Sequence, residues 1–443
     1  MNWKESFNMT SFQRERNANA VMRILDAAVS AANPAEAIRR SLSRDGILLR
    51  VNERAYPLKE FSAIYTISVG KAAISMAIAT SALLGENLHE GLIVAKYKPT
   101  ASLPKNLTFL ESSHPLPDER SLTAGEYILA FLKKTKARDL VIFLISGGGS
   151  ALITSPETGV SLKDMEKLTS LLLGCGARID EINTLRRALD RVKGGGLARA
   201  AFPAKTISLL LSDVIDSPLE AIASGPTVPN PTTRSDALSV LKKYDLLSQS
   251  PSTIIEVLQK EEEEPLYGDF FSRGMVHIAG SNLMSAQAAK AQAMQEGFDA
   301  KILTTSLQGE AAQVGHELAT RLANNKKRPI CFILGGETTV SLGDTTGRGG
   351  RNQEVALAAV ADLAGIPNVM LVTLATDGED GPTDAAGAVV TGETLERAQL
   401  LGMDVDIHLQ NHNAYPFFDA LGDLLKIGPT GTNVNDLTFL FAF

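Results

Sequence analysis

The sequence predicts an α/β protein made of two α/β domains, and three observations support this class. At 443 residues the chain is too long for one ordinary hydrophobic core, and of the two or three domains that its length allows we expect two. Short β-rich runs alternate with helical segments along most of the chain. Gly-rich stretches follow several of these runs, where ligands bind in α/β proteins.

The N-terminal domain, residues 1–245, is expected to hold a parallel sheet with helices on both faces. It opens with helix, because Val21, Ile24, Leu25 and Ala28 recur at helical spacing. Further strands are predicted at residues 63–69, 92–95, 107–110, 140–146 and 205–212. Further helices are predicted at residues 72–84, 118–134, 162–173 and 180–193.

The C-terminal domain, residues 246–443, repeats the alternation. A break in the pattern at the Pro-Asn-Pro-Thr stretch 229–232 precedes it. Its strands are predicted at residues 276–279, 300–304, 330–334, 369–376 and 437–443. Its helices are predicted at residues 282–296, 310–324 and 354–363.

Composition excludes some classes of partner. The net charge of -7 would repel a phosphate backbone, and an aromatic content of 5% argues against base-stacking surfaces, so we expect no nucleic-acid partner. Cys175 and Cys331 are far apart, which gives no disulfide framework or zinc pattern. The sequence has no apolar h-region near its start and no long apolar run, so we expect no membrane partner and a cytoplasmic location. A homodimer is compatible with the sequence.

Two loops of the first domain have the composition of anion sites. Gly70-Lys71 follows a predicted strand and opens a helix, and a cation at a helix N-terminus is best explained by an anionic ligand that shares the site. Ser146-Gly147-Gly148-Gly149-Ser150 follows the most hydrophobic predicted strand, and its backbone amides could wrap a phosphate. A nucleophile elbow is excluded because Gly-x-Ser-x-Gly is not met.

The stretch 335–354 is the corresponding loop of the second domain. Its six glycines would let backbone N–H groups approach an anion, while Arg348 and Arg351 offer planar guanidinium groups that match phosphate or carboxylate. Acidic residues follow other predicted strands, at Asp213 and in the stretch 377–384, where carboxylates that hold magnesium are plausible. The spacing of these acidic residues does not match a calcium loop.

Taken in order, these loops give the chain a resemblance to the class II glycerate kinases, the glycerate 2-kinase family with a C-terminal MOFRL domain. Each motif alone is weak, but the ordered set is specific and extends over nearly the whole chain. The matching stretches are residues 68–73, 114–118, 146–151, 212–214, 224–227, 335–340, 347–354, 376–378 and 428–433. Residues 187–190 and 411–415 depart from the family pattern.

The resemblance implies a Rossmann-like N-terminal domain, a MOFRL core at about 329–438, and an active site in the cleft between the two domains. It implies ATP-dependent phosphorylation of D-glycerate at its 2-hydroxyl with a divalent cation, for which we expect Mg²⁺. It also points to Lys71 and Arg351 as catalytic residues.

Phosphoryl transfer mainly requires positioning and charge neutralisation, so we expect Lys71 and Arg351 to neutralise the transferring group and to grip the glycerate carboxylate. Asp213 or Asp377 would hold the metal or orient the attacking hydroxyl; the sequence does not choose between them. Contacts to ATP are predicted for Ser146, Gly147, Gly148, Gly149, Ser150, Gly335, Gly336, Glu337, Gly347, Gly349 and Gly350.

Two other functions are compatible with α/β units and glycine loops. One is an NAD(P)H-dependent hydroxypyruvate reductase, against which no Gly-x-Gly-x-x-Gly follows an early strand. The other is a non-catalytic sugar-phosphate-binding protein, which the several acidic loops fit poorly.

Overall fold

The structure, a computed structural model, describes residues 9–14, 16–260, 269–343 and 345–443. The chain divides into two compact units. The central unit is Ala37–Ala279, and the terminal unit combines the residues through Glu36 with Gly280–Phe443. These units differ from the predicted domains 1–245 and 246–443, since the chain enters and leaves the central unit from the terminal one.

The central unit is built on a six-stranded sheet with strand order β6-β5-β4-β7-β8-β9. The strands are β4 (Ala63–Val69), β5 (Leu88–Ala95), β6 (Leu107–Glu111), β7 (Asp139–Ile145), β8 (Lys205–Leu211) and β9 (Gly274–Gly280). Strands β4 to β8 pair in parallel, which confirms the predicted Rossmann-like sheet. The chain moves away from β4 in one direction and from β7 in the other, so these two strands form a topological switch point.

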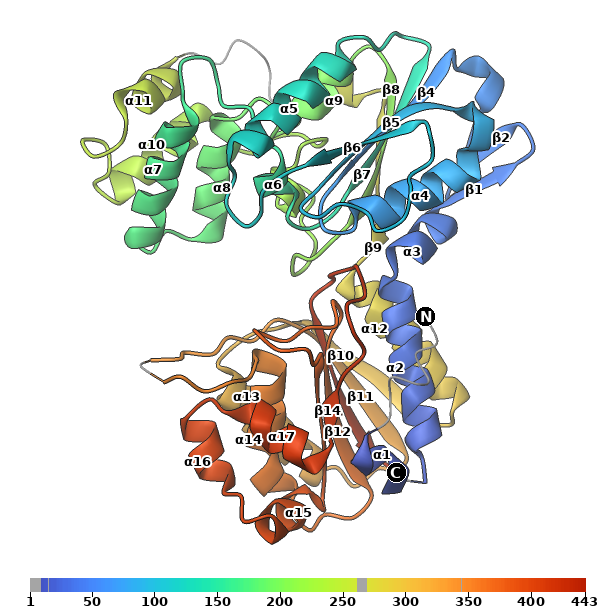
Figure 1. The fold of residues 1–443 in the computed structure, drawn as a ribbon, viewed down its shortest axis with the longest axis vertical. Helices are drawn as coiled ribbons and strands as arrows, with labels where there is room; N and C mark the ends of the chain where they lie inside the picture. The colour runs from blue at the N-terminus through green and yellow to red at the C-terminus, as the bar shows by residue number, and fades with distance from the viewer. Residues whose placement is uncertain (1–8, 15, 261–268, 344) are drawn as a thin grey trace. The chain divides into compact units, whose positions relative to one another are not determined.

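Helices cover both faces of this sheet (Figure 1). Helix α4 (Ala73–Leu84) follows β4, whereas α5 (Glu119–Leu132) and α9 (Gly196–Ala201) pack on the opposite face. Phe143 and Ile145 of β7 share a buried cluster with Ile128 of α5, as expected of a strand that is buried on both faces. Asp118 begins α5 with a capping box.

Two further parts of the central unit lie outside this sheet. Helices α7 (Leu162–Gly174), α8 (Ile179–Ala188), α10 (Arg234–Lys243) and α11 (Ser252–Gln259) share a separate hydrophobic core. Helix α8 is shorter than the predicted 180–193, because the chain turns at Leu189 and continues through Gly194 and Gly195 with positive φ. The small sheet β1 (Leu42–Asp45), β2 (Leu48–Val51) and β3 (Arg54–Pro57) was not predicted.

The terminal unit has a mixed six-stranded sheet with strand order β10-β11-β15-β12-β13-β14. The strands are β10 (Asp299–Leu307), β11 (Ile330–Gly336), β12 (Val369–Ala375), β13 (Gly387–Thr391), β14 (Leu424–Leu425) and β15 (Asp436–Ala442). Strands β10 and β11 run parallel, and β15 inserts antiparallel between β11 and β12. The predicted strand 276–279 is not part of this sheet, because it forms β9 at the edge of the central sheet.

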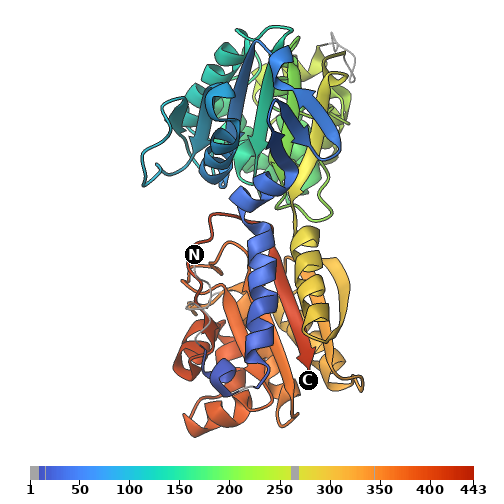
Figure 2. The ribbon, with the colours of Figure 1, turned by 90° about the vertical axis from the view of Figure 1, so that its right-hand side faces the viewer.

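Alternating side chains of β11 supply both cores of the terminal unit. Phe332 and Leu334 pack with α13 (Ala311–Ala323) and α14 (Arg351–Leu363), whereas Cys331 and Ile333 share a cluster with α2 (Ala18–Ala32) and α12 (Asn282–Gln295). Figure 2 shows α2 beside α12, which places the N-terminal helix in this unit. The other α-helices described in this unit are α1 (Thr10–Arg14), α15 (Thr394–Leu400), α16 (Val405–Gln410) and α17 (Ala414–Leu421), and α3 (Pro34–Ser41) leads from it into the central unit.

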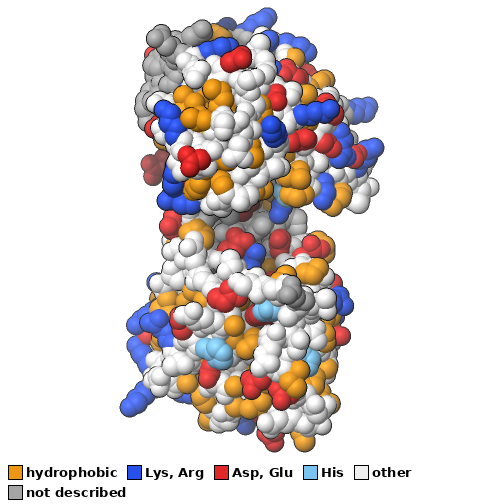
Figure 3. All heavy atoms as spheres, turned by 90° about the vertical axis from the view of Figure 1, so that its left-hand side faces the viewer, with side chains coloured by type: hydrophobic (Ala, Val, Ile, Leu, Met, Phe, Trp, Pro, Cys, Tyr) orange, Lys and Arg blue, Asp and Glu red, His pale blue; other side chains and the backbone are white. Residues whose placement is uncertain are grey.

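The surface and the cysteines follow ordinary patterns. Acidic and basic side chains are interspersed on the face shown in Figure 3. Cys175 and Cys331 are free thiols, and Cys331 is buried in a sheet core. Among the described residues, no helix combines the length and the apolar character that crossing a membrane requires.

Candidate functional site

Lys71 lies at the carboxyl edge of the central sheet, directly after β4. Gly70 has φ +128°, and a Cβ there would lie 2.1 Å from Ser146 Oγ, so the close approach of the two loops requires glycine. The Lys71 N–H donates to Gly147 O at 2.9 Å, which fixes its backbone. Its side chain is exposed and forms no ion pair with a described residue. Lys71 is therefore a cation available to an anionic ligand.

The Ser146 loop follows β7, the neighbour of β4 at the switch point. Ser146 is 1% exposed, and its Oγ accepts the Ala72 N–H at 3.0 Å, so this hydroxyl joins the two loops. Gly148 has φ +80° and precedes the short helix α6 (Gly149–Leu152). Ser150 shares a hydrogen bond of 2.8 Å with the hydroxyl of Ser224. The predicted loop thus contains one serine that holds the backbone and a turn that requires glycine.

Asp213 and His114 flank this loop. A Cβ on Gly147 would lie 1.8 Å from Asp213 Oδ2, so the carboxylate rests against the loop backbone. The ring of His114 lies beside Gly148. Burial lowers the pKa of His114, and the charges of Lys71 and Lys96 lower it further, which favours the neutral imidazole.

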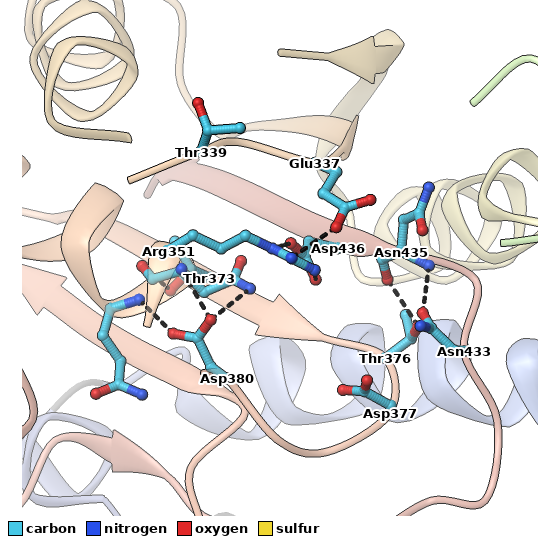
Figure 4. Close-up of polar contacts among 12 residues, drawn as sticks. Glu337, Thr339, Arg351, Thr373, Thr376, Asp377, Asp380, Asn433, Asn435 and Asp436 are labelled. Atoms are coloured by element: carbon cyan, nitrogen blue, oxygen red, sulfur yellow. Dashed lines mark hydrogen bonds and ion pairs between the residues drawn. The ribbon is translucent and has the colours of Figure 1, made fainter. Parts of the chain in front are cut away.

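Arg351 is the first residue of α14 in the terminal unit and lies between two carboxylates (Figure 4). Its Nε donates to Asp436 Oδ2 at 2.6 Å, and its Nη1 lies 2.6 Å from Glu337 Oε1. Burial opposes the charge, but the hydrogen bond to Asp436 and the negative charges of Asp436, Glu337 and Asp380 together outweigh it and raise the pKa of Arg351. Unlike Lys71, this cation is already paired within the protein.

Asp380 holds the first turn of α14. It is 2% exposed, and its carboxylate accepts the N–H groups of Asn352 at 3.1 Å and Gln353 at 2.9 Å. A Cβ on Gly350 would lie 2.3 Å from Asp380 Cγ, which explains glycine before the helix. Burial raises the pKa of Asp380 to about 7, although the hydrogen bonds from the helix lower it. Asp380 therefore fixes the backbone that carries Arg351.

The other predicted glycines of this stretch are enclosed by packing. A Cβ on Gly335 would lie 1.6 Å from Asn282 Oδ1, and one on Gly336 would lie 2.2 Å from Leu307 O. A Cβ on Gly347 would lie 1.9 Å from Asn411 O, and one on Gly349 would lie 3.3 Å from Ala414. These glycines serve close backbone approach, and their contacts to ATP remain predictions.

The predicted arginine loop contacts the first turn of α17 and the residue before it. The Arg348 guanidinium lies 4.0 Å from the centroid of the Tyr415 ring, and the Tyr415 N–H donates to Arg348 O at 2.9 Å. Next to it, His412 Nδ1 and Glu354 Oε1 are 2.7 Å apart. Burial raises the pKa of Glu354, while the hydrogen bond with His412 lowers it. Arg348 thus has a structural contact.

Asp377 follows β12 and is half-buried. Its Oδ1 accepts the Glu379 N–H at 3.2 Å. Asp213 and Asp377 belong to different units, and the described residues contain no group of three or more potential metal-ligating His, Cys, Asp or Glu side chains. The alternative roles predicted for these two aspartates therefore remain predictions.

Sequence reasoning missed Asp436, Asp380 and Asn282 as site residues. Asn282 Nδ2 donates to Val434 O at 3.0 Å and to Asp436 O at 2.9 Å, so it holds the start of β15. Asp436 directly precedes the predicted apolar strand 437–443. A charged residue next to a buried strand is a signal for a buried carboxylate with a cationic partner. Asp380 lies in the acidic stretch that was predicted, but its role as a helix cap depends on tertiary structure.

The fold and its loops define an α/β protein with glycine-rich loops and cationic side chains at the strand ends. A family model described as "Domain of unknown function (DUF4147)" matches residues 20–259, and the MOFRL family model matches residues 330–436. The D-glycerate 2-kinase of Thermotoga maritima is 41% identical to this chain over 88% of it and 93% of that protein.

Two further comparisons complete this picture. A crystal structure of glycerate kinase from Thermotoga maritima has a TM-score of 0.85 and 38% identity, covering 96% of this chain and 99% of that one. An Agrobacterium vitis protein with the provisional name hydroxypyruvate reductase is 38% identical over 94% of this chain and 92% of its own. The chain belongs to the glycerate kinase family in which a DUF4147 region precedes a MOFRL region.

Proposed function

We propose that this protein transfers a phosphoryl group from ATP to the 2-hydroxyl of D-glycerate, giving 2-phospho-D-glycerate and ADP. The observation that carries the proposal is Lys71, which forms no ion pair with a described residue and lies beside the Gly147–Gly149 loop at the switch point of a parallel sheet. Such edges bind ligands in α/β proteins, and phosphoryl transfer requires a cation near the transferring group. Family membership supports the same reaction.

In this proposal Lys71 neutralises the charge that develops on the phosphoryl oxygens. Arg351 would contribute the second cation. Because it is paired with Glu337 and Asp436, it can bind a substrate anion only if one of these carboxylates releases it. Glu337, whose side chain is 42% exposed against 9% for Asp436, is the carboxylate that can exchange for a substrate anion. Arg351 would then grip the glycerate carboxylate or the phosphoryl group while Asp436 keeps it oriented.

Asp213 fits a role in holding magnesium, because its carboxylate rests on the loop that we assign to the phosphates. Magnesium is held in proteins by one or two carboxylates together with substrate phosphates, and it supplies charge neutralisation when bound. Asp377 is the alternative ligand, or orients the attacking hydroxyl. A cytoplasmic location and a homodimer remain predictions from the sequence.

The name of the Agrobacterium vitis relative favours a second candidate, a hydroxypyruvate reductase. Against it, β4 and α4 are joined by Gly70-Lys71-Ala72 without the glycine pattern that admits a dinucleotide pyrophosphate. The kinase therefore accounts better for the loop.

An enolase-coupled assay separates the candidates. Purified protein is incubated with ATP, Mg²⁺ and D-glycerate, and the product is passed to enolase and pyruvate kinase. Enolase accepts 2-phosphoglycerate, so a direct signal supports the proposal. A signal that requires added phosphoglycerate mutase would indicate the 3-hydroxyl instead, and NADPH consumption with hydroxypyruvate would favour the reductase.

A further inference from the structure

The central unit contains a cavity of about 500 Å³ that begins at the Ser146 loop and extends to α7. At one end it is lined by Gly148 and Ser150, next to the loop residues described above. On another side α7 lines it with Met165, Thr169 and Leu173, which recur every four residues and so form one face of the helix. The polar side chains of Glu166 and Ser170 line the cavity beside this face. The cavity therefore joins a predicted phosphate loop to a largely apolar wall.

Arg186 of α8 supplies an uncompensated cation to this cavity. Its side chain lines the wall, and burial lowers the pKa of Arg186 with no offsetting carboxylate. Its side-chain hydrogen bond, from Nη1 to Asn183 Oδ1, is long at 3.4 Å, and no described carboxylate lies within ion-pair distance. A half-buried guanidinium without an anion loses solvation that a ligand phosphate would restore.

The neighbouring cations Lys193 and Arg187 do not combine a place in the cavity wall with the lack of an ion pair. Lys193 also lines the cavity, but its ammonium contacts the Asp190 carboxylate and donates to Ile153 O, so its charge is neutralised within the protein. Arg187 faces neutral partners, with its Nε donating to Asn230 Oδ1 at 2.9 Å. Arg186 is thus distinct from both, because it lines the cavity and forms no ion pair with a described residue, the cavity-lining Glu166 included.

We propose that this cavity holds the nucleotide of the phosphate donor, with Arg186 on its phosphates and the base against the Met165–Thr169–Leu173 face. This assignment rests on the proposed kinase function. A volume of about 500 Å³ lies within the range of roughly 300–1,000 Å³ found for sites of drug-sized ligands, whereas a three-carbon acid would leave most of it empty. The combination of a cation, a glycine loop and an apolar wall suits a ligand with a charged end and a flat apolar end.

Calorimetric titration with ADP and with inorganic tripolyphosphate tests both halves of the assignment. Arg186→Ala should weaken binding of both ligands about tenfold or more, because a charge-assisted hydrogen bond is lost. Thr169→Trp should fill the space of the base and weaken ADP at least tenfold while leaving tripolyphosphate within about twofold. Arg186→Gln, which can keep the contact to Asn183, replaces the alanine variant if that one does not fold.

Two matched controls come from the same helices. Arg178→Ala removes an exposed arginine that precedes α8 and pairs with Asp180, and Lys167→Trp places the same large ring on an exposed position of α7. Both should bind ADP like the unmodified protein. Unchanged ADP affinity in the folded Arg186 and Thr169 variants would overturn the assignment, as would an effect confined to the KM for glycerate.

The outcome is separable from the proposed function. If the unmodified protein binds ADP with the expected dependence on Arg186 but phosphorylates no glycerate, the kinase proposal fails and the nucleotide cavity stands. If glycerate is phosphorylated and neither variant alters nucleotide affinity, the cavity assignment fails alone.

Discussion

Lys71 and Arg351 carry the same charge in opposite surroundings. Lys71 is exposed, and among the described residues its hydrogen bond is made through its backbone, so removing its side chain leaves no described buried group without a partner. Arg351 neutralises Asp436, which is 7% exposed, and its loss would leave a buried carboxylate uncompensated. The two residues should therefore separate a loss of catalysis from a loss of stability.

Lys71→Ala should lower kcat by about a hundredfold or more, because a group that stabilises charge in the transition state is removed. The free energy of unfolding should change by less than about 0.5 kcal/mol, as for ordinary surface substitutions. Steady-state kinetics with D-glycerate and denaturant unfolding measure the two quantities, and Lys59→Ala is the exposed-lysine control. Near-normal turnover would remove Lys71 from the mechanism.

Arg351→Ala should also reduce turnover, but with a loss of about 3 kcal/mol in the free energy of unfolding, because Asp436 is left as a buried charge. The double variant Arg351→Ala/Asp436→Asn should recover part of that stability without recovering activity. Denaturant titration of the single and double variants checks this. If the double variant is no more stable than the single one, the pairing with Asp436 does not account for the loss.

At the scale of elements, the start of α14 shows what local sequence can and cannot predict. Residues 330–334 were correctly predicted as a strand, the following stretch as a glycine loop and residues 354–363 as a helix, because hydrophobic runs and glycines are local signals. The predicted helix began at Glu354, whereas α14 begins at Arg351. The difference arises because Asp380, distant in sequence, accepts the N–H groups of the first turn.

The capping of α14 by Asp380 predicts that the free energy of unfolding depends on pH. The folded-state pKa of Asp380 is about 7, above the value of about 3.9 expected in the unfolded chain, so the folded protein binds the extra proton. This contribution to stability is complete below about pH 4 and is lost as the pH rises through about 7. Relative to Asp380→Asn, the unmodified protein should lose about 1.4 kcal/mol per pH unit between those limits.

Denaturant unfolding at pH 5 and pH 6 measures that slope for both proteins. Slopes are compared because Asn is a weaker hydrogen-bond acceptor than a carboxylate. This difference shifts the free energy of unfolding of Asp380→Asn by an amount that does not depend on pH. Parallel slopes for the two proteins would contradict the elevated pKa of Asp380.

At the scale of the whole molecule, the sequence predicted two α/β domains, and the two compact units of the structure have other bounds than those domains. The helical periodicity of residues 21–28 was recognised, yet nothing local says that this helix packs against α12 more than two hundred residues later. The placement of β9 in the central sheet and of antiparallel β15 between β11 and β12 likewise depends on long-range pairing. Composition and hydrophobic periodicity thus predicted the fold class and most helices and strands, whereas the strand order of the sheets and the ion pairs depend on the tertiary structure.

The division into units can be tested by hydrogen exchange. Ile24→Ala should lower the free energy of unfolding of the terminal unit by about 2–5 kcal/mol, because Ile24 of α2 is fully buried in the cluster that α2 shares with α12 and the sheet. Exchange should accelerate in α12 and β12 and stay unchanged in β4 and β7. Ile128→Ala, a buried position of the central unit, should give the reverse pattern; faster exchange in β4 for Ile24→Ala would contradict the division.

The transfer to the 2-hydroxyl of glycerate is tested most directly by proton-coupled ³¹P NMR of the reaction with ATP and Mg²⁺. Phosphate on the 2-hydroxyl couples to the single proton of C2 and gives a doublet, which is the predicted result. Phosphate on the 3-hydroxyl couples to two protons and gives a triplet. A triplet as the first product, or no phosphorylated glycerate at all, would contradict the proposed function.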